Sequence, residues 1–350
     1  MKIAFLVNQI CTETSAYTTT RLAYDALQRG HDVCYFGCAD LLFDPQGRIQ
    51  ALATRTPSGK RFRGHRLFLA ALQGPEAVRE VVDLTELDVL MLRNDPASDQ
   101  VERPWAQSVG ILFGQALAAR GVLVLNDPAG LAGALNKMYL QHFPPEVRPA
   151  TLITRDPEQI RAFVKEHRKQ GVVLKPLQGS GGQSVFLVRH DDPANTNQII
   201  EAVEQLGYVV AQEYVPAAAR GDTRLILLNG VPLEVNGKFC AFTRVGQKGD
   251  LRNNVTVGGK VRAAKVTPRM LQLAEAVRPR LVQDGMFLVG LDVVGDRILE
   301  INVFSPGGLR AASQFSGVDF TGHVMDAIET KVEHKRRSPA PLPNRELAAL

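Results

Sequence analysis

Short apolar runs alternate with stretches of helical character along the first 125 residues of the chain. Four of these runs have the length and composition of buried strands: residues 3–7, 33–36, 87–92 and 122–125. Between them, residues 18–28 and 108–119 are predicted to form helices that end at Gly30 and Gly121. Strands that alternate with helices are typical of an α/β domain with a doubly wound parallel sheet.

The pattern changes after a cluster of prolines at residues 144–149, which is a candidate domain boundary. Asp156 followed by Pro157 predicts the start of a helix, and a basic run before Gly171 predicts its end. Two strands with a glycine-rich loop between them are then expected, at residues 171–175, 179–182 and 184–188.

The stretch from Val289 to Gly308 has the composition of a β-hairpin. Its second strand carries Glu300 and Asn302 on one face, and its first strand carries Asp292. A three-residue loop would pair Asp292 with Glu300, whereas a two-residue loop would turn Glu300 away. Oxygen ligands inside apolar strands are costly to bury unpaired, and they suit Mg²⁺ held jointly with phosphates. A solvated strand face with ordinary hydrogen bonds is the alternative.

The glycine-rich loop is a candidate for phosphate binding. Its glycines would let backbone N–H groups approach a polyphosphate, and Lys175 just before it would supply a positive charge. It is not a P-loop, because Gly-Lys-Ser/Thr is absent, and a flexible hairpin turn is the alternative. The first strand-to-helix loop, residues 8–15, contains no glycine, which excludes a dinucleotide site of the usual kind.

Three other segments are candidates for ligand contacts. Residues 209–216 form an apolar strand that could present backbone groups to the edge of a planar base. Residues 244–259 are polar, irregular and rich in glycine, and such a stretch within a compact domain is usually functional. Residues 93–96 follow the end of a strand, where open α/β sheets bind ligands, although a plain turn would read the same way.

The composition is that of an ordinary soluble globular protein, with 45% hydrophobic and 22% charged residues among 350. No run reaches transmembrane length, and the cysteine content is typical of a reducing compartment, so we expect a cytoplasmic protein. Residues 334–350 carry most of the net charge of +5 and are rich in proline, and we expect them to be disordered. The weakly charged body argues against nucleic acid and membrane partners.

Taken together, these segments occur in the order of the ATP-grasp fold, and the chain resembles bacterial glutathione synthetases up to about residue 332. The segments that carry the resemblance include Asn136-Lys137, Lys175-Pro176-Leu177 with the glycine loop, residues 212–216, and the Asp292, Glu300, Asn302 triplet. Further matches are residues 92–96, 126–128, 151–154, 221–224 and 251–259. The resemblance implies an N-terminal doubly wound parallel-sheet domain at 1–126 and a two-subdomain ATP-grasp fold at 127–213 and 214–333.

The resemblance also implies the chemistry: an ATP-dependent carboxylate–amine ligase that joins γ-glutamylcysteine and glycine through an acyl phosphate. The implied ATP-binding residues are Lys137, Lys175, Gly179, Ser180, Gly181, Gly182, Glu213, Tyr214, Val215 and Asp222. Mg²⁺, or Mn²⁺ in its place, would be bound by Asp292, Glu300 and Asn302. The implied catalytic residues are Arg224, Arg252 and Gly259, and the implied substrate-binding residues are Arg244, Asn253, Asn254, Ser305, Gly307 and Gly308.

The chain departs from the family pattern after Asn302, where it reads Val-Phe-Ser-Pro-Gly-Gly and lacks the threonines that usually flank Ser-Pro. Gly307 and Gly308 would open the acceptor end of the pocket, which leaves the acid and the amine uncertain. Another ATP-grasp amino-acid or peptide ligase and a non-catalytic ATP-binding module are the alternatives, and the intact triplet and lysines argue against the module. The expected partners are small-molecule substrates, and only the resemblance favours a homo-oligomer.

Overall fold

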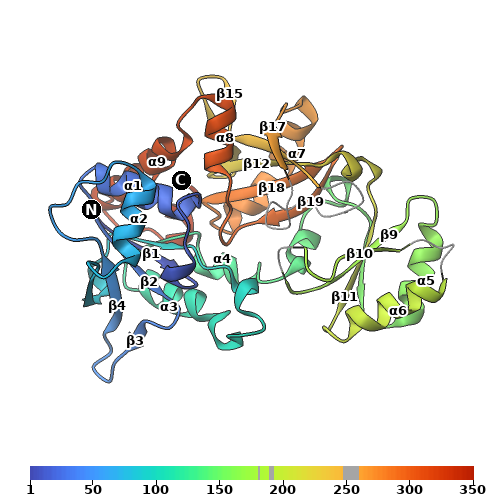
Figure 1. Ribbon diagram of the computed structural model, residues 1–350, viewed down its shortest axis with the longest axis horizontal. Helices are drawn as coiled ribbons and strands as arrows, with labels where there is room; N and C mark the ends of the chain where they lie inside the picture. Colours follow the sequence, from blue (N-terminus) through green and yellow to red (C-terminus); the bar gives the residue numbers. More distant parts are fainter. Residues whose placement is uncertain (180–181, 189–192, 247–259) are drawn as a thin grey trace.

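The computed structural model describes residues 1–179, 182–188, 193–246 and 260–350, and it arranges them around three main sheets (Figure 1). The first sheet has a parallel centre in the order β2, β1, β6, β7. These strands are Asp32–Gly37, Lys2–Val7, Val89–Leu92 and Leu123–Leu125. All four expected strands are therefore confirmed, and so is the parallel sheet.

Helices cover both faces of this centre. On one face, Ile3, Phe5 and Val7 share a core with α1 (Thr18–Gln28), α2 (His65–Gln73) and α9 (Phe320–Arg337). On the other face, Ala4 and Leu6 share a core with α3 (Val109–Ala118). Successive residues of β1 thus point to opposite faces, and both faces are buried. A strand buried on both sides reads as a continuous apolar run, which is why the sequence revealed it.

Three strands of the same sheet were not predicted: β3 (Leu41–Phe43), β4 (Ile49–Arg55) and β5 (Val78–Asp83). They extend the sheet beyond β2 with antiparallel pairing. Most of β5 is exposed, and its sequence mixes valines with charged residues. The hydrophobic pattern that marks a buried strand is therefore absent from it.

The second sheet has four strands in the order β10, β9, β11, β8, and it is antiparallel throughout. Its strands are Phe186–Val188, Val172–Pro176, Val209–Glu213 and Thr151–Thr154. Two helices, α5 (Pro157–Glu166) and α6 (Pro193–Glu204), pack on it around a hydrophobic core that is separate from the other cores. In Figure 1 this unit lies to the right, away from the first sheet.

The third sheet contains the order β17, β16, β12, β18, β19, and β13 pairs with β12. The main strands are Lys260–Ala263, Ala241–Val245, Asp222–Leu228, Leu288–Val294 and Arg297–Asn302. The smaller strands are β13 (Val231–Pro232) and the hairpin of β14 (Glu234–Val235) and β15 (Lys238–Phe239). Helices α7 (Pro268–Gln283) and α8 (Leu309–Ser316) contact strands of this sheet.

The hairpin of β18 and β19 has a two-residue turn rather than the three-residue loop that was considered. Val294 pairs with Arg297 across Gly295 and Asp296, and Gly295 has a φ of +58°, which glycine adopts without strain. A register shift then makes Leu299 an extra residue, so that Asp292 lies opposite Glu300. The expected pairing of the two carboxylates is therefore present, but a bulge produces it and not the loop length.

The expectation of a disordered C-terminal tail is wrong for residues 334–349. Helix α9 continues to Arg337, and a further helix, α10, spans Asn344–Ala349. Leu347 and Ala348 are buried in the core that contains β1. The Asn344 side chain accepts from Val124 N (2.8 Å) and donates to Val124 O (2.9 Å), so it occupies the outer edge of β7. The domain limits at residues 126, 213 and 333 stay a prediction.

No helix of the described chain is long and apolar enough to cross a membrane. The four cysteines are free thiols, of which Cys11 is exposed and the other three are buried.

Candidate active site

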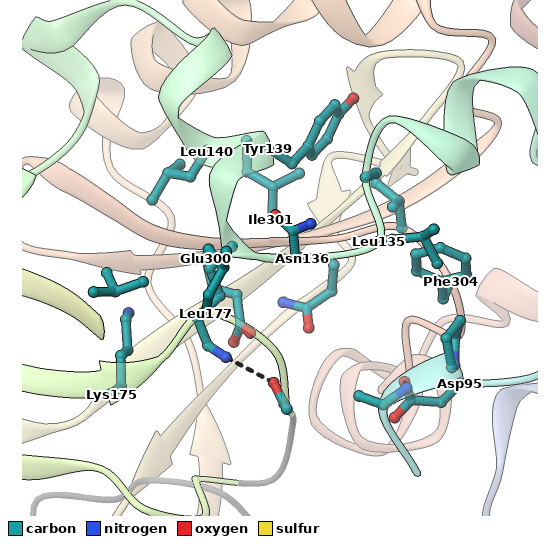
Figure 2. Close-up of a pocket in the computed structure, with 18 of the residues that line it drawn as sticks. Asp95, Leu135, Asn136, Tyr139, Leu140, Lys175, Leu177, Glu300, Ile301 and Phe304 are labelled. Atoms are coloured by element: carbon teal, nitrogen blue, oxygen red, sulfur yellow. Dashed lines mark hydrogen bonds between the residues drawn. The ribbon is translucent and has the colours of Figure 1, made fainter. Parts of the chain in front are cut away.

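A cavity of about 160 Å³ lies where segments from the regions of the three main sheets meet. One wall comes from Asp95, Pro96 and Ala97 of the N-terminal domain, and another from Lys175 and Gln212 of the four-stranded sheet. The β19 strand and the loop after it contribute Glu300 to Ser305. Figure 2 shows Lys175 on one side of the cavity and Asp95 with Phe304 on the other.

Lys137 stands at the start of a 3₁₀ helix, Lys137–His142, whose N-cap Asn136 accepts from Met138 N. Its Nζ donates to the carbonyl oxygens of Pro176 (2.9 Å) and Gly179 (2.8 Å), at the beginning of the glycine loop. Burial, together with the nearby charge of Lys175, lowers the pKa of the Lys137 ammonium to about 8. The poorly solvated Lys137 ammonium therefore fixes the start of the glycine loop through two hydrogen bonds.

Lys175 comes from β9, where it pairs with Val210 of β11. Gln212 lies two residues further along β11 on the same face, and its Oε1 accepts from Lys175 Nζ at 3.0 Å. The amide nitrogen of Gln212 donates to Thr151 Oγ1 at 3.2 Å, which turns its oxygen toward the lysine. Burial lowers the pKa of Lys175, and the carboxylate of Glu300 opposes this shift.

The hydrogen bonds of these two ammonium groups within the described chain go to neutral oxygens. Burial of a cation beside another cation is unfavourable unless an anion compensates it. Two lysines held in this way next to a glycine loop form a site that a polyphosphate would stabilise.

Glu300 faces the cavity from β19 and is exposed. It makes no hydrogen bond or ion pair with any residue that the structure describes. Asn302, on the same strand, donates from Nδ2 to Asp292 Oδ2 at 3.1 Å and to Gly290 O at 3.4 Å. Its amide oxygen is therefore directed away from Asp292 and is left for another partner.

Beside the cavity, four charged side chains of the six-stranded sheet form a cluster of ion pairs. Both oxygens of Asp292 accept from Arg224, each at 2.7 Å, in a bidentate pair. Arg244 bridges Asp222 Oδ1 and Asp292 Oδ2, also at 2.7 Å each. Asp292 is 3% exposed, Arg244 6% and Asp222 8%. Two arginines and two aspartates balance each other inside the sheet.

The pKa values of this cluster follow from its geometry. Burial alone would raise the pKa of Asp292, but Arg224 and Arg244 outweigh it and hold that pKa well below its usual range. Within the described chain, Asp222 is hydrogen-bonded to one arginine, Arg244, and has the carboxylate of Asp292 close by. Burial and the charge of Asp292 therefore raise its pKa. The two carboxylates raise the pKa of the Arg244 guanidinium against the effect of burial.

The donors near the cavity fit a hard cation in part. The Glu300 carboxylate and the Asn302 amide oxygen are both oxygen ligands of the kind that Mg²⁺ prefers. The oxygens of Asp292 are already occupied by two arginines and an amide. Among the described residues no cluster of three or more His, Cys, Asp or Glu side chains is suited to a metal. This sparse donor set suits a cation that takes its remaining ligands from phosphates and water.

The structure brings some of the expected site residues to the cavity and leaves others away from it. Lys137, Lys175, Gly179, Glu300, Asn302 and Ser305 line it. Glu213, Tyr214 and Val215 are absent from its lining, and the N–H of Tyr214 already donates to Gly171 O at 3.0 Å. The residues Ser180, Gly181, Arg252, Asn253, Asn254 and Gly259 lie outside the described residues.

The three other glycines named from the sequence do not line the cavity either. Gly182 has a positive φ of +78°. At Gly308 an added Cβ would lie 2.1 Å from the ring of Phe242, so this glycine is required by packing. At Gly307 an added Cβ would meet nothing within 4 Å. Of the two departures from the family pattern, Gly307 is therefore the one that leaves open space.

Sequence reasoning pointed to only some of the residues that line the cavity. Residues 93–96 were named as candidates for ligand contacts, which covers Asp95 and Pro96 but not Ala97, and Gln212 was noted only as part of a motif. Phe304 was noted as a departure from the family pattern, but its place in the cavity wall was not anticipated. A signal for Gln212 was present, because it is a polar residue within an otherwise apolar strand.

Comparison with protein families gives two adjacent matches. Residues 1–132 match the N-terminal domain of prokaryotic glutathione synthetase, and residues 136–317 match the ATP-grasp domain of prokaryotic glutathione synthetase.

Curated relatives named glutathione synthetase are similar over most of their length. The one from Vibrio parahaemolyticus is 34% identical over 311 residues, which is 88% of this chain and 91% of the relative. The one from Escherichia coli O6:H1 is 33% identical over 318 residues, 89% and 92% of the two chains.

Solved structures show the same fold at low sequence identity. The D-cycloserine synthetase DcsG superposes with a TM-score of 0.59 at 15% identity and covers 93% of this chain and 99% of its own. The ATP-grasp ligase PsnB, in a complex with a precursor variant, Mg and ADP, has a TM-score of 0.59 at 17% identity and covers 94% and 98%.

Proposed function

Because the chain belongs to the prokaryotic glutathione synthetase family, it is an ATP-dependent ligase that forms a C–N bond, and we propose that it joins γ-glutamylcysteine and glycine. The observation that carries this proposal is the cavity itself. Two lysines bonded only to neutral oxygens within the described chain face a carboxylate and an amide oxygen across one small space.

ATP would bind with its phosphates against Lys137, Lys175 and the glycine loop from Gly179 to Gly182. A phosphate oxygen would supply the anionic hydrogen-bond partner that these buried ammonium groups lack in the described chain. We assign the adenine to the segment Glu213 to Val215. Its backbone donor at Tyr214 is already engaged, so the base would use the remaining backbone groups of the segment.

The reaction proceeds in two steps. In the first, a carboxylate oxygen of the acid attacks the γ-phosphorus of ATP, the bond from that phosphorus to the bridging oxygen breaks, and ADP leaves. In the second, the amine nitrogen attacks the carbonyl carbon of the acyl phosphate, inorganic phosphate leaves with its oxygen, and the nitrogen loses a proton. Neither step needs a nucleophile from the protein, so positioning and charge compensation carry the rate.

The arginine cluster would serve the developing charge of the acyl phosphate. A guanidinium has five N–H donors, and Asp292 occupies two of those on Arg224. Asp292 therefore fixes the plane of Arg224 and leaves the other N–H groups outside this pair. We assign Arg224, with Arg252 and Gly259, to catalysis. Arg244, Asn253, Asn254 and Ser305 are assigned to the substrates, and Asp222 supports Arg244.

Glu300 and Asn302 would hold Mg²⁺ against the ATP phosphates, and Asp292 would orient Asn302 through its hydrogen bond. Mn²⁺ could take the same oxygen ligands. A cation bound there supplies compensation for the charge on the transferring phosphoryl group. The free thiols fit a reducing compartment, and we propose a cytoplasmic location on that basis.

ADP release with a panel of acids and amines tests the assignment. We expect turnover with γ-glutamylcysteine plus glycine, and the open space at Gly307 favours some turnover with alanine, β-alanine or serine. Gly307→Thr should return the preference to glycine, because its side chain would fill that open space. Turnover with another acid but none with γ-glutamylcysteine would leave only a different ATP-grasp ligase. ADP binding without turnover on any pair would indicate a non-catalytic ATP-binding module.

A further inference from the structure

The cavity wall formed by Asp95, Pro96 and Ala97 is held by side chains that do not themselves line the cavity. This wall begins a 3₁₀ turn, Pro96–Asp99, in the connection between β6 and α3. A second 3₁₀ turn, Pro104–Ala106, follows in the same connection. Short turns of this kind have little internal hydrogen bonding, so their shape depends on contacts from outside.

Asn8, the residue that follows β1, bonds both backbone groups of Asp95. Its Oδ1 accepts from Asp95 N at 2.8 Å, and its Nδ2 donates to Asp95 O at 2.9 Å. The same Nδ2 donates to Asp99 Oδ2 at 2.7 Å. An amide supplies the donor and the acceptor that these three contacts require, whereas a carboxylate would place its oxygen against two other oxygens.

Asp99 is 3% exposed and bonds Arg103 through its second oxygen. Oδ1 accepts from Arg103 Nε at 2.9 Å and also from Nη2. Arg103 Nη2 in turn donates to the backbone oxygen of Asn8 at 3.2 Å. Asn8, Asp99 and Arg103 therefore form a closed ring of hydrogen bonds, and we use the name "Asn8 ring" for these three residues.

The Asn8 ring is connected to the phosphate side of the cavity at two points. Asp95 lies close enough to Lys137 for its charge to act on the ammonium group. Gln100, the residue after Asp99, donates from Nε2 to Gln178 Oε1 at 3.5 Å, just before the glycine loop. The oxygen of Gln100 also lies 3.8 Å from where a Cβ on Gly179 would be. The start of the glycine loop is thus contacted by Lys137 on one side and by Gln100 on the other.

We propose that the Asn8 ring is a positioning element for the nucleotide, which it serves by fixing the wall from Asp95 to Ala97 and by placing Gln100 against the start of the glycine loop. This inference rests on the proposed use of ATP. It goes beyond that proposal because none of the three ring residues touches the cavity. Loss of the ring changes the fit of the phosphates and leaves the arginine cluster and the β18–β19 hairpin as they are.

Titration of the protein with ADP and Mg²⁺, followed by calorimetry, tests the ring without reliance on turnover. Asn8→Asp should weaken ADP binding about tenfold, because it puts an oxygen against Asp95 O and Asp99. Arg103→Ala should weaken it by a similar factor, and Arg103→Lys should recover part of the loss because one hydrogen bond to Asp99 remains. Arg120→Ala is the matched control, since Arg120 donates to the backbone oxygens of Ala116 and Gly47 and lies over the ring of Phe43, so the affinity of this variant should equal that of the wild type.

Steady-state kinetics gives the second readout, which a merely structural role would not produce. KM for ATP should rise with the loss of affinity, while kcat and KM for the amine stay within about twofold of the wild type. Gln100→Ala removes a half-buried side chain whose hydrogen bond goes to Gln178 and should raise KM for ATP about threefold, so it decides the matter if Asn8→Asp fails to fold. Wild-type ADP affinity in folded Arg103→Ala and Gln100→Ala would overturn the inference. Failure of the wild type to join any acid and amine, with ADP binding intact, would overturn the ligase assignment alone.

Discussion

The arginines of the six-stranded sheet and the lysines of the cavity are both poorly solvated cations, but their partners differ. Arg224 and Arg244 are bonded to the carboxylates of Asp222 and Asp292 at 2.7 Å. Lys137 and Lys175 are bonded to backbone carbonyls and to a side-chain amide at 2.8 to 3.0 Å. The charges of the arginines are neutralised by bonded carboxylates, whereas the charges of the lysines have no bonded carboxylate within the described chain.

This difference separates two tasks. A buried ion pair has its desolvation compensated in the free protein, so the arginine cluster needs no ligand to hold its geometry. A buried lysine without a carboxylate on its ammonium group has a lowered pKa and gains most when an anion arrives. We therefore propose that the arginines provide preorganised hydrogen-bond donors for the chemistry and that the lysines provide affinity for the nucleotide.

The largest expected effect is on stability, and it follows removal of the Asp292 carboxylate from the centre of the arginine cluster. Asp292→Asn leaves two guanidinium groups with only Asp222 as an anionic partner in the cluster, and we expect the free energy of unfolding to fall by about 3 kcal/mol. Urea unfolding measures the loss. Asp296→Asn, at the exposed turn of the same hairpin, is the matched control and should cost less than about 0.5 kcal/mol. A loss below about 1 kcal/mol for Asp292→Asn would mean that the cluster is not the internally neutralised unit described here.

Glu300 lines the cavity with the two lysines, and its substitution should lower turnover without changing stability. Glu300→Gln keeps the size of the side chain but removes the charge that would hold Mg²⁺, so turnover should fall at least roughly a hundredfold. Unfolding should be unchanged, because Glu300 is exposed and unbonded within the described chain. Near wild-type turnover of the folded variant in saturating Mg²⁺ would remove the hairpin from the mechanism.

The smallest expected effect concerns Lys137, whose lowered pKa should make nucleotide affinity depend on pH. The pKa of Lys137 is lowered from 10.5 to about 8, so above pH 8 the free protein loses the charge that a phosphate would bind. ADP affinity should then fall by up to about tenfold per pH unit between pH 8 and 9, with proton uptake on binding. Calorimetry in two buffers of different ionisation enthalpy measures that uptake. Lys137→Met should bind ADP more weakly at pH 7 and lose most of the dependence.

The same shift has a consequence for stability whose sign is opposite to that of an ion pair. The folded-state pKa of Lys137 lies below its unfolded value of 10.5, so the unfolded chain binds more protons between about pH 8 and 10.5. The contribution of Lys137 to stability is therefore unfavourable below pH 8 and is relieved as the pH rises through that window. A lysine in an ion pair would show the reverse.

The parts of the fold that the sequence predicted are those with a local signal. Ile3 to Val7 is buried on both faces and reads as an apolar run, and the Asp156 N-cap before Pro157 marks the start of α5. The face shared by Glu300 and Asn302 follows from the two-residue period of a strand. By contrast, β5 is exposed and mixes charges with valines, so nothing in its sequence distinguishes it from a loop.

The parts of the site that the sequence could not predict depend on pairings across long separations. The contact of Lys175 with Gln212 follows from the register of β9 with β11, which is set by the whole sheet. The bulge at Leu299 decides whether Glu300 lies opposite Asp292, and no residue type in the turn specifies it. Arg224 and Asp292 lie 68 residues apart in the sequence, and only the order of strands in the sheet brings them together.

Asn344 covers the outer edge of β7, but it is synthesised long after that strand. Val124 leaves the ribosome 220 residues before the side chain that satisfies its backbone N–H and C=O. At about 5 to 20 residues per second, that interval lasts roughly ten to forty-five seconds. During this time the first sheet has an open edge, and open edges pair readily with other chains. The nascent protein is therefore most exposed to misassociation through this edge before α10 has been made.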